Sequence, residues 1–547
     1  MSKTNSHADS DHVGTKKIRQ GLWKLSSMRL YVALMLCFCV FSTNLIRSNL
    51  SMAMVCMVNS TALALMHEDS QQFIIGNGSF SNGSSSDCKL PSVAKAEYDG
   101  EFVWPSDKQA MLFAAIYWGG LISGFPGGWL ADRYGPKNVL LCSVLLNIIG
   151  ALLSPISAER GGHVALFVVR FFMGIGQGLL YPAISSLMSR WFPPEERSTI
   201  IALYTSGNQM SMVLGMPLSA WLCEQKRFLG GWPSIFYTAG IFGLIWSFLW
   251  FIFLTNSPEK NRKISTVEKQ FLSQQLAGQS LQKNRKAATR KVPWLKILTS
   301  PPMLVNMLSS FTANVIGSML LSYLPTYFKD VLLLDIKSNG FYTALPFLCQ
   351  LVFKYTSAPL ADALKRNTKI SHTTICKVFQ SISAFGASFV LIGLSFVGCS
   401  QPALALALLC IGSALFSGLI SGFMTSLVSI APQYTGIVNS FARVPSQLGS
   451  LVIPYMIGAI TVHGTHKEWQ IVFLIVSGMN IAVGIAFLIF GSAEIQEWAK
   501  VPTPPDADSP PPSSRKEAQM PLYVVTDPNG KISEQKPDEQ LQQLQHI

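Results

Sequence analysis

Gly128-Trp-Leu-Ala-Asp132-Arg133-Tyr-Gly135-Pro-Lys137 is the stretch that decides the organisation of this chain, because a shortened copy follows 230 residues later as Ala358-Pro-Leu-Ala-Asp362-Ala-Leu-Lys365-Arg366. Both copies place Leu-Ala-Asp and then basic residues at the end of a long apolar run. A second pair of similar segments, at 185–189 and 425–429, also follows apolar runs and leads to a proline. One polar turn after an apolar run is ordinary, but two copies at equivalent places predict a chain of two related halves.

Twelve apolar stretches surround these segments, and each is long enough to cross a membrane as a helix. About 20 apolar residues span the roughly 30 Å of hydrocarbon. No stretch alternates with period 2, as the strands of a barrel do. Of the 547 residues 49% are hydrophobic and only 13% are charged, whereas an average soluble domain is about 25% charged. The chain is therefore predicted to be an all-α membrane protein with two six-helix bundles, and a soluble enzyme, a disordered chain and a collagen-like fibre are excluded. The stretches are 30–58, 109–131, 138–157, 164–188, 199–222, 233–254, 303–325, 339–361, 375–397, 402–424, 435–462 and 470–491.

Charges between the stretches predict the orientation and the domain boundaries. Cytoplasmic segments carry an excess of Lys and Arg. Basic residues dominate the start of the chain and the central linker, whereas the 59–108 loop has three Lys against seven acids. Both termini and the linker are therefore predicted to be cytoplasmic, and the 59–108 loop is predicted to face the exterior. The boundaries are an N-terminal segment at 1–29, an N-terminal bundle at 30–254, a linker at 255–302, a C-terminal bundle at 303–491 and a tail at 492–547, Pro-rich at 502–512 and predicted to be disordered.

The exterior loop carries modification signals. Asn59, Asn77 and Asn82 each begin an N-glycosylation acceptor pattern. Cys88 could form a disulfide with Cys399 or with Cys223, both near the exterior ends of their helices. The net charge of +13 lies mainly in cytoplasmic segments beside the spans, so membrane lipid headgroups are the expected anionic neighbours and nucleic acid is not.

Four cations lie inside the predicted spans, where a charge costs about 2.5–3.5 kcal/mol on insertion scales and usually faces a functional pathway. Arg47 lies roughly 18 Å and Arg170 roughly 10 Å from the exterior ends of their helices. Lys354 and Arg443 lie roughly 12–14 Å from the cytoplasmic ends. No Asp, Glu or His lies well inside a span. Each cation has an ordinary alternative, in which it reaches the membrane surface or caps a helix end, and this alternative is weakest for Arg47. Together they predict an electropositive pathway and an anionic substrate, which arginine binds through two parallel hydrogen bonds.

Uncharged polar residues complete the candidate sites, although each is as readily explained as a contact between helices. Such residues in the spans include Tyr204, Asn208 and Gln209 besides those of the substrate site. The candidate substrate-binding residues are Arg47, Arg170, Arg443, Gln177, Tyr117 and Asn314. The candidate cytoplasmic gate motif is Gly128, Asp132, Arg133, Gly135 and Asp362, in which the aspartate would cap a helix or pair with an arginine and latch the two halves.

With these residues identified, the chain resembles the major facilitator superfamily and, within it, the anion/phosphate symporter family that contains sialin, the vesicular glutamate transporters and the sodium-phosphate transporters. The resemblance covers about residues 28–499. It implies two bundles that expose a central site alternately to each side of the membrane, and Arg47 and Arg170 match family arginines implicated in anion binding. The superfamily signature is Gly-x-x-x-Asp-Arg-x-Gly-x-Lys at 128–137, and the family patterns include Arg47-Ser-Asn-Leu-Ser51, Trp191-Phe-Pro-Pro-Glu-Glu-Arg-Ser198, Leu324-Pro-Thr-Tyr327 and Ile430-Ala-Pro-Gln-Tyr434.

The chain departs from the family at positions that bear on coupling. Met173 and Gln177 stand where sialin-like members carry two glutamates tied to proton coupling. Ala313 stands at the seventh-span arginine of the glutamate transporters, and Arg443 stands where relatives usually have an uncharged residue. These differences argue against a glutamate transporter and against carboxylate-based proton coupling.

The predicted function is secondary active or potential-driven transport of small organic anions by alternating access, performed by a monomer. Sodium-dependent transport of inorganic phosphate is the alternative within transport, and a transporter-like anion receptor or scaffold is the alternative of another class. No nucleophile–base set, metal-ligand cluster or phosphate loop indicates an enzyme. No catalytic residues, cofactor or resident metal are therefore expected, and the co-transported ion, sodium or proton, stays open. The expected location is the plasma membrane or an endolysosomal or vesicular membrane, which the chain crosses many times.

Overall fold

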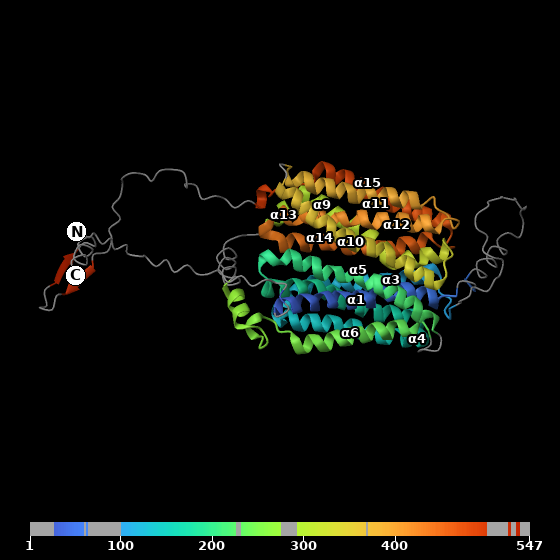
Figure 1. Cartoon of the computed structure of the whole chain (residues 1–547), viewed down its shortest axis with the longest axis horizontal. Coiled ribbons are helices and arrows are strands. Elements are labelled where there is room, and N and C mark those ends of the chain that lie inside the picture. The colour runs from blue at the N-terminus through green and yellow to red at the C-terminus, as the bar shows by residue number, and fades with distance from the viewer. Residues whose placement is uncertain are drawn as a thin grey trace, which may run out of the picture. The chain divides into compact units, whose positions relative to one another are not determined.

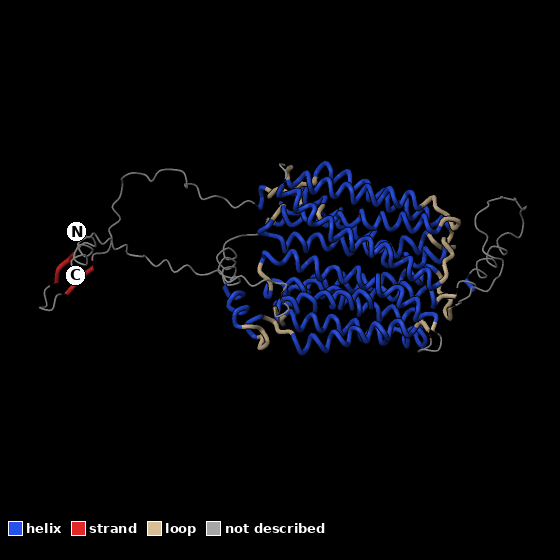
Figure 2. The backbone as a smooth tube through the Cα atoms, in the orientation of Figure 1, coloured by secondary structure: helices blue, strands red, loops and turns tan. Residues whose placement is uncertain are grey.

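Long helices lie side by side in the computed structural model (Figure 1), which describes residues 24, 27–59, 62–63, 100–225, 231–274, 293–367, 370–499, 523–526 and 532–535. Loops gather at the two ends of these helices (Figure 2). The N-terminal half contains α1 (Met28–Met57), α3 (Ser106–Tyr134), α4 (Pro136–Trp191), α5 (Pro194–Glu224) and α6 (Pro233–Phe253), followed by η1 (Pro258–Lys260). The C-terminal half contains α8 (Trp294–Leu298), α9 (Pro301–Asp330), α10 (Ile336–Asn367), α11 (His372–Leu394), α12 (Pro402–Phe416), η2 (Ser417–Ile420), α13 (Phe423–Ser429), η3 (Pro432–Tyr434), α14 (Thr435–Ile460), α15 (His466–Phe490) and η4 (Glu497–Ala499).

The predicted spans are confirmed as helices, to within a few residues at their ends. The third and fourth spans both lie in α4, which bends at Gly162 (φ 60°, ψ −154°), and α12, η2 and α13 together form the tenth. Seven helices among the described residues are by themselves long and apolar enough to cross a membrane, or eight if α3, bent by 59°, is one span. The long helices outside that set are α5, α10 and α14. Two pairs of helices pack across the two halves, α5 with α10 and α3 with α14. Side chains in these contacts face protein and not lipid, so these helices need fewer apolar residues.

The two bundles share an apolar core at one end. We call this the loop end, where α1 ends and α3 begins, and we call the opposite end the linker end, where α6 runs into the linker. The largest apolar cluster contains residues of both halves near the loop end. Toward the linker end, the N-terminal bundle has its own apolar cluster, to which the C-terminal half contributes Leu451. A separate cluster in the C-terminal half includes Met303 and Ile430. Burial of apolar surface therefore holds the halves together chiefly at the loop end.

Polar and aromatic contacts add to this closure of the loop end. Lys329 Nζ donates to the Val55 carbonyl at 3.1 Å, and Lys337 forms an ion pair with Glu224 at 2.9 Å. The rings of Phe113 in α3 and Tyr323 in α9 lie 4.8 Å apart between centroids. Each contact joins an N-terminal helix to a C-terminal one, so the loop end can open only if all of them break.

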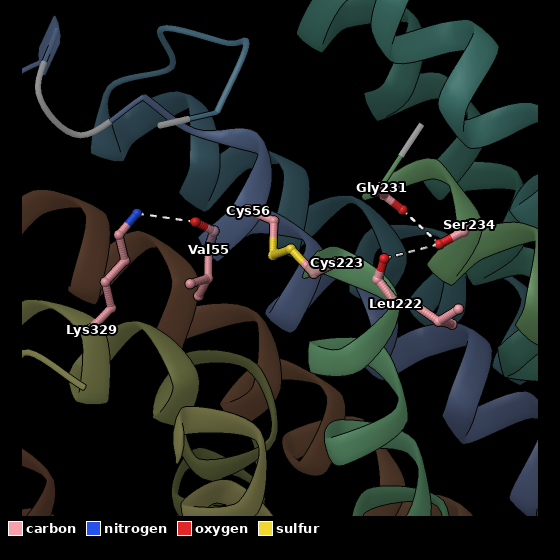
Figure 3. The surroundings of a disulfide bond; sticks show 7 residues. All are labelled: Val55, Cys56, Leu222, Cys223, Gly231, Ser234 and Lys329. Atoms are coloured by element: carbon pink, nitrogen blue, oxygen red, sulfur yellow. Dashed lines mark hydrogen bonds between the residues drawn. A yellow bond between two sulfur atoms is a disulfide. The ribbon is translucent and has the colours of Figure 1, made fainter. Parts of the chain in front are cut away.

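A disulfide between Cys56 and Cys223 ties the end of α1 to the end of α5 (Figure 3). Their Cα atoms are 6.5 Å apart, and 167 residues separate them in sequence. The possible pairing of Cys88 with Cys223 is therefore wrong, because Cys223 is bonded to Cys56. The packing of α1 against α5 brings these two cysteines together. Cys399 is also disulfide-bonded, whereas Cys88 lies outside the described residues.

The linker is anchored to the N-terminal bundle through Glu268, which is fully buried. Its carboxylate accepts hydrogen bonds from Ser27 Oγ (2.8 Å), the Met28 N–H (2.9 Å) and Arg29 Nε (3.0 Å). Arg29 is also fully buried and pairs in addition with Glu196, near the start of α5. A carboxylate 240 residues away in sequence thus caps α1 and complements the positive end of its dipole.

The tail from Lys500 to Ile547 forms a unit of its own. In it, β1 (Tyr523–Thr526) and β2 (Ile532–Gln535) pair antiparallel, with Tyr523 opposite Gln535. For these residues the expectation of disorder is wrong, because the Tyr-Val-Val-Thr run of β1 favours an extended chain.

Candidate functional site

The centre of the candidate site is a contact between α1 and α3. Arg47 Nη2 donates to the Tyr117 hydroxyl at 2.9 Å, and the guanidinium carbon lies 4.9 Å from the centroid of the same ring. Tyr117 is buried and Arg47 is half-buried. The ring therefore holds the guanidinium in place through a cation–π contact and a hydrogen bond. Neither contact neutralises its charge.

Arg170 of α4 lies against the same arginine and is 1% exposed. Its Nη2 reaches the Arg47 carbonyl at 3.5 Å, while its Nε and Nη1 are buried and have no hydrogen-bond partner in the described part of the chain. No described Asp or Glu forms an ion pair with Arg47 or Arg170. A buried charge without a partner is costly, and no acidic side chain in the described part of the chain offsets this cost.

The C-terminal bundle contributes hydroxyl groups to the same site. Ser318 and Ser322 of α9 lie near the Tyr117 hydroxyl. Ser318 in turn donates to Ser450 of α14 at 2.8 Å. The hydroxyl of Tyr323 is buried and has no partner among the described residues. The site therefore lies between the two bundles, next to the contacts that close the loop end.

Two predicted site residues have hydrogen bonds elsewhere. Gln177 donates to the Thr43 carbonyl at 3.2 Å and to Asn147 Oδ1 at 3.1 Å, so it links helices as the alternative interpretation held. Asn314 donates to the Ser310 carbonyl of its own helix at 2.9 Å. Within the described residues, neither side chain forms a hydrogen bond with Arg47 or Arg170.

The other two cations of the spans come from the C-terminal bundle and contact the N-terminal one. Lys354 of α10 is 5% exposed, and its Nζ donates to Thr205 Oγ1 of α5 at 2.7 Å. Arg443 of α14 is exposed, and its guanidinium carbon lies 4.4 Å from the centroid of the Tyr181 ring in α4. Lys354 is thus buried between the bundles, whereas Arg443 is exposed beside the Tyr181 ring. Tyr181 was missed in the sequence, although it follows Gln177 by one helical turn on the same face of α4.

The gate motif is built around the turn between α3 and α4. Asp132 accepts hydrogen bonds from Ser186 at 2.9 Å and from Arg190 at 3.5 Å, both in α4. Arg133 lies over the rings of Trp129 and Tyr134. The contacts of the aspartate therefore stay within the N-terminal bundle and do not latch the two halves. The side chain of Asp362 lies outside the described part.

Glycines of the motif have different roles. Gly135 has φ 88°, a conformation that favours glycine, and a Cβ there would lie 2.8 Å from the Asn256 amide. A Cβ at Gly128 would meet no atom within 4 Å, so no packing requirement for glycine is visible there.

Of the three glycosylation candidates, the structure describes Asn59. Its Oδ1 accepts a hydrogen bond from the Ala62 N–H at 2.8 Å. Asn77 and Asn82 lie outside the described residues. In the described ranges, no group of three His, Cys, Asp or Glu side chains could hold a metal ion.

Comparison with known proteins identifies the family. Residues 36–442 match the Major Facilitator Superfamily model. An uncharacterised transporter of Caenorhabditis elegans is 36% identical over 490 residues, 87% of this chain and 90% of its own. A candidate inorganic phosphate cotransporter of Drosophila melanogaster is 33% identical over 473 residues, 86% of each chain. Human sialin is 31% identical over 481 residues, 86% of this chain and 91% of its own.

The fold agrees with these relatives. The solved structure of a D-xylose–proton symporter matches with a TM-score of 0.61 at 16% identity, over 85% of this chain and 99% of its own. The family model, the relatives along most of the chain and the two-bundle fold lead to one conclusion: the chain belongs to the major facilitator superfamily, in the family of sialin, the vesicular glutamate transporters and the inorganic phosphate cotransporters, and is a multi-pass membrane transporter.

Proposed function

We propose that this transporter carries small organic anions and binds them at Arg47 and Arg170. The observation that supports this most directly is the pair of buried, unpartnered donors of Arg170, Nε and Nη1. Each of these donors can form a charge-assisted hydrogen bond with an oxygen of a carboxylate or phosphate group. An anion placed there would complete the hydrogen bonds of Arg170 and offset the repulsion between the two arginines.

Binding at this place would couple to the movement of the bundles. Arg47, Tyr117 and Arg170 belong to the N-terminal bundle, whereas Ser318 and Ser322 face Tyr117 from α9. An anion bound between them would contact both bundles. We propose that the shared core at the loop end separates to release or admit the anion on that side, while the linker end closes, as alternating access requires.

We further propose that the linker end is cytoplasmic. The disulfide between Cys56 and Cys223 lies at the loop end, and disulfides form and persist in oxidising compartments. The basic linker and the acceptor pattern at Asn59 favour the same orientation. The transporter would act as a monomer surrounded by lipid, without enzymatic activity, in the plasma membrane or in an endolysosomal or vesicular membrane.

Inorganic phosphate is the second candidate substrate. It is favoured by the Drosophila cotransporter, and a guanidinium pair binds phosphate as readily as carboxylate. The absence of the two sialin-type glutamates, replaced here by Met173 and Gln177, favours sodium or the membrane potential over protons as the driving force.

Flux through proteoliposomes that contain the full chain tests the proposal. Labelled phosphate, urate and sialate are offered singly and in competition, with sodium, pH and potential varied separately. Arg47→Ala should abolish the flux of the transported anion, and Arg160→Ala, an exposed arginine of α4, should not. Equal flux in wild type and Arg47→Ala protein of matched membrane content would refute the binding site. Saturable binding with no flux of any anion would favour the receptor or scaffold instead.

A further inference from the structure

Arg443 is a cation of the C-terminal bundle held against the N-terminal one. It comes from α14, and its guanidinium carbon lies over the ring of Tyr181 in α4. In the described part of the chain it has no carboxylate partner and no hydrogen-bond acceptor. A cation–π contact holds a guanidinium over the ring without using a hydrogen-bond acceptor. The contact therefore orients the charge and leaves its donors available.

Tyr181 connects this place to the arginine pair. Arg170, Gln177 and Tyr181 are spaced by seven and four residues, so they lie on one face of α4. Tyr181 is roughly 16 Å from Arg170 along the helix, toward the linker end. On the opposite side, Gln447 lies one turn from Arg443 in α14. A Cβ at Gly120 of α3 would be 3.3 Å from Gln447 Nε2. The Gln447 side chain therefore lies against α3, one helical turn from Tyr117.

Tyr204 of α5 is the third member of the group. It is 8% exposed and belongs to the apolar cluster against which Tyr181 also packs. Neither tyrosine hydroxyl has a hydrogen-bond partner among the described residues. Tyr181 and Tyr204 thus offer two hydroxyl donors and Arg443 offers a guanidinium, from three helices, in the half of the protein where the bundles have separate cores.

We propose that Arg443, Tyr181 and Tyr204 form a second anion site on the linker side of the arginine pair, which binds the carboxylate or phosphate group of the transported substrate. The inference rests on the proposed function, because it takes the same anion as ligand. Arg443 attracts the anion at the linker side, and the two hydroxyl groups donate to it before it reaches Arg47 and Arg170, or after it leaves them. The site requires both bundles, so it exists only while Arg443 and Tyr181 are together.

A merely structural role for Arg443 makes a different prediction. If the stacked pair only holds α14 against α4, its loss alters the conformational equilibrium and changes transport from both sides. If it is an anion site, its loss weakens binding from the linker side alone. Affinity measured separately on the two sides therefore separates the two roles.

The test uses the full chain in proteoliposomes sorted by orientation, with the anion among phosphate, urate and sialate that gives the largest flux. Arg443→Gln should raise the KM for anion offered at the linker side by about ten- to a hundredfold, the effect of one lost charge-assisted hydrogen bond. The KM at the loop side should stay within about twofold of the wild-type value. Arg443→Lys should restore part of the affinity, and Tyr181→Phe, which keeps the ring, should have an intermediate effect. Arg160→Gln is the matched control.

Equal changes of KM on both sides, or no change on either, would overturn the second site. Loss of flux in Arg47→Ala with unaltered KM values in Arg443→Gln would overturn only this inference and leave the proposed function standing. If the wild type shows no flux, equilibrium binding of the same labelled anions to the solubilised chain decides. The wild type should then bind the anion at two classes of sites, of which Arg443→Gln removes one and Arg47→Ala removes the other. If the wild type has a single class of sites, and only Arg47→Ala removes it, the proposal is contradicted.

A lipid headgroup could supply the same anionic chemistry. The assay is therefore repeated in vesicles of phosphatidylcholine alone and with phosphatidylserine. An effect of Arg443→Gln that occurs only with phosphatidylserine would assign the residue to lipid and refute the substrate site. The same effect in both vesicles is the expected result.

Discussion

Arg170→Met should make the substrate-free protein more stable and inactive in transport. Arg170 is 1% exposed with two unpartnered donors, and its one hydrogen bond, to the Arg47 carbonyl, is long at 3.5 Å. Each buried, unsatisfied donor costs about 1–3 kcal/mol, and the long bond contributes about 1 kcal/mol at most. Methionine fills a similar, irregular volume without polar atoms. The free energy of unfolding should therefore rise by about 1–4 kcal/mol, the gain seen when buried ionic groups are replaced by apolar ones.

The assay is thermal unfolding of the solubilised full chain, with and without the transported anion. Without anion, the midpoint of Arg170→Met should exceed that of the wild type by several degrees. With anion at about a hundred times its Kd, the wild type should gain about 2.7 kcal/mol, whereas the variant should gain little. Arg160→Met, an exposed position ten residues earlier in the same helix, is the control and should change the free energy by about 0.5 kcal/mol or less.

Two results would refute this reasoning. A midpoint of Arg170→Met clearly below both the wild type and Arg160→Met would mean that the buried guanidinium is stabilising, so its donors must be satisfied. Undiminished stabilisation of Arg170→Met by the anion would mean that Arg170 is not a ligand. In either case the arginine pair could not carry the proposed function in the way described.

Three further predictions concern the scaffold. Glu268→Gln removes the charge that caps α1 and one of the two carboxylates paired with fully buried Arg29, so it should lower the free energy of unfolding by about 1–3 kcal/mol; thermal unfolding in detergent measures this, and an unchanged midpoint would contradict the cap. Cys56→Ser opens a loop of 167 residues and should cost about 2–5 kcal/mol; reducing agent, which also breaks the disulfide of Cys399 in both proteins, should lower the wild type to the stability of the reduced variant. Gly135→Ala forces a Cβ onto φ 88° and against Asn256, so it should destabilise by more than about 1 kcal/mol; expression level and unfolding midpoint together report it, and a neutral effect would show that the turn relaxes.

Some features could be predicted from single segments of the chain. An apolar run of about 20 residues has few alternatives to a membrane helix, so the spans were located to within a few residues. The four cations were found because their cost in lipid makes them exceptional. The repeat at Asp132 and Asp362 indicated two halves, and the family resemblance added the expectation that Arg47 and Arg170 share a role.

Other features depend on how helices turn toward one another. Gln177 and Asn314 have the same kind of polar side chain as a ligand would need, but their hydrogen bonds go to neighbouring helices and to their own backbone. Tyr181 was missed because a tyrosine in a span is ordinary until Arg443 is placed over it. The spacing of cysteines did not distinguish the partner of Cys223, and nothing near Ser27 indicates that Glu268 caps α1.

The sequence by itself determined that this is a multi-pass membrane protein of two related halves with unpaired cations in its spans, because these properties depend on composition and on local hydrophobicity. Only the tertiary structure decided which cations meet: Arg47 and Arg170 lie together with no counter-charge among the described residues, whereas Arg443 lies apart over Tyr181. It also decided that the halves share their core at the loop end. The physical reason is that charge compensation and burial depend on distances between helices far apart in sequence, and the rotation and pairing of helices are set by packing over the whole molecule.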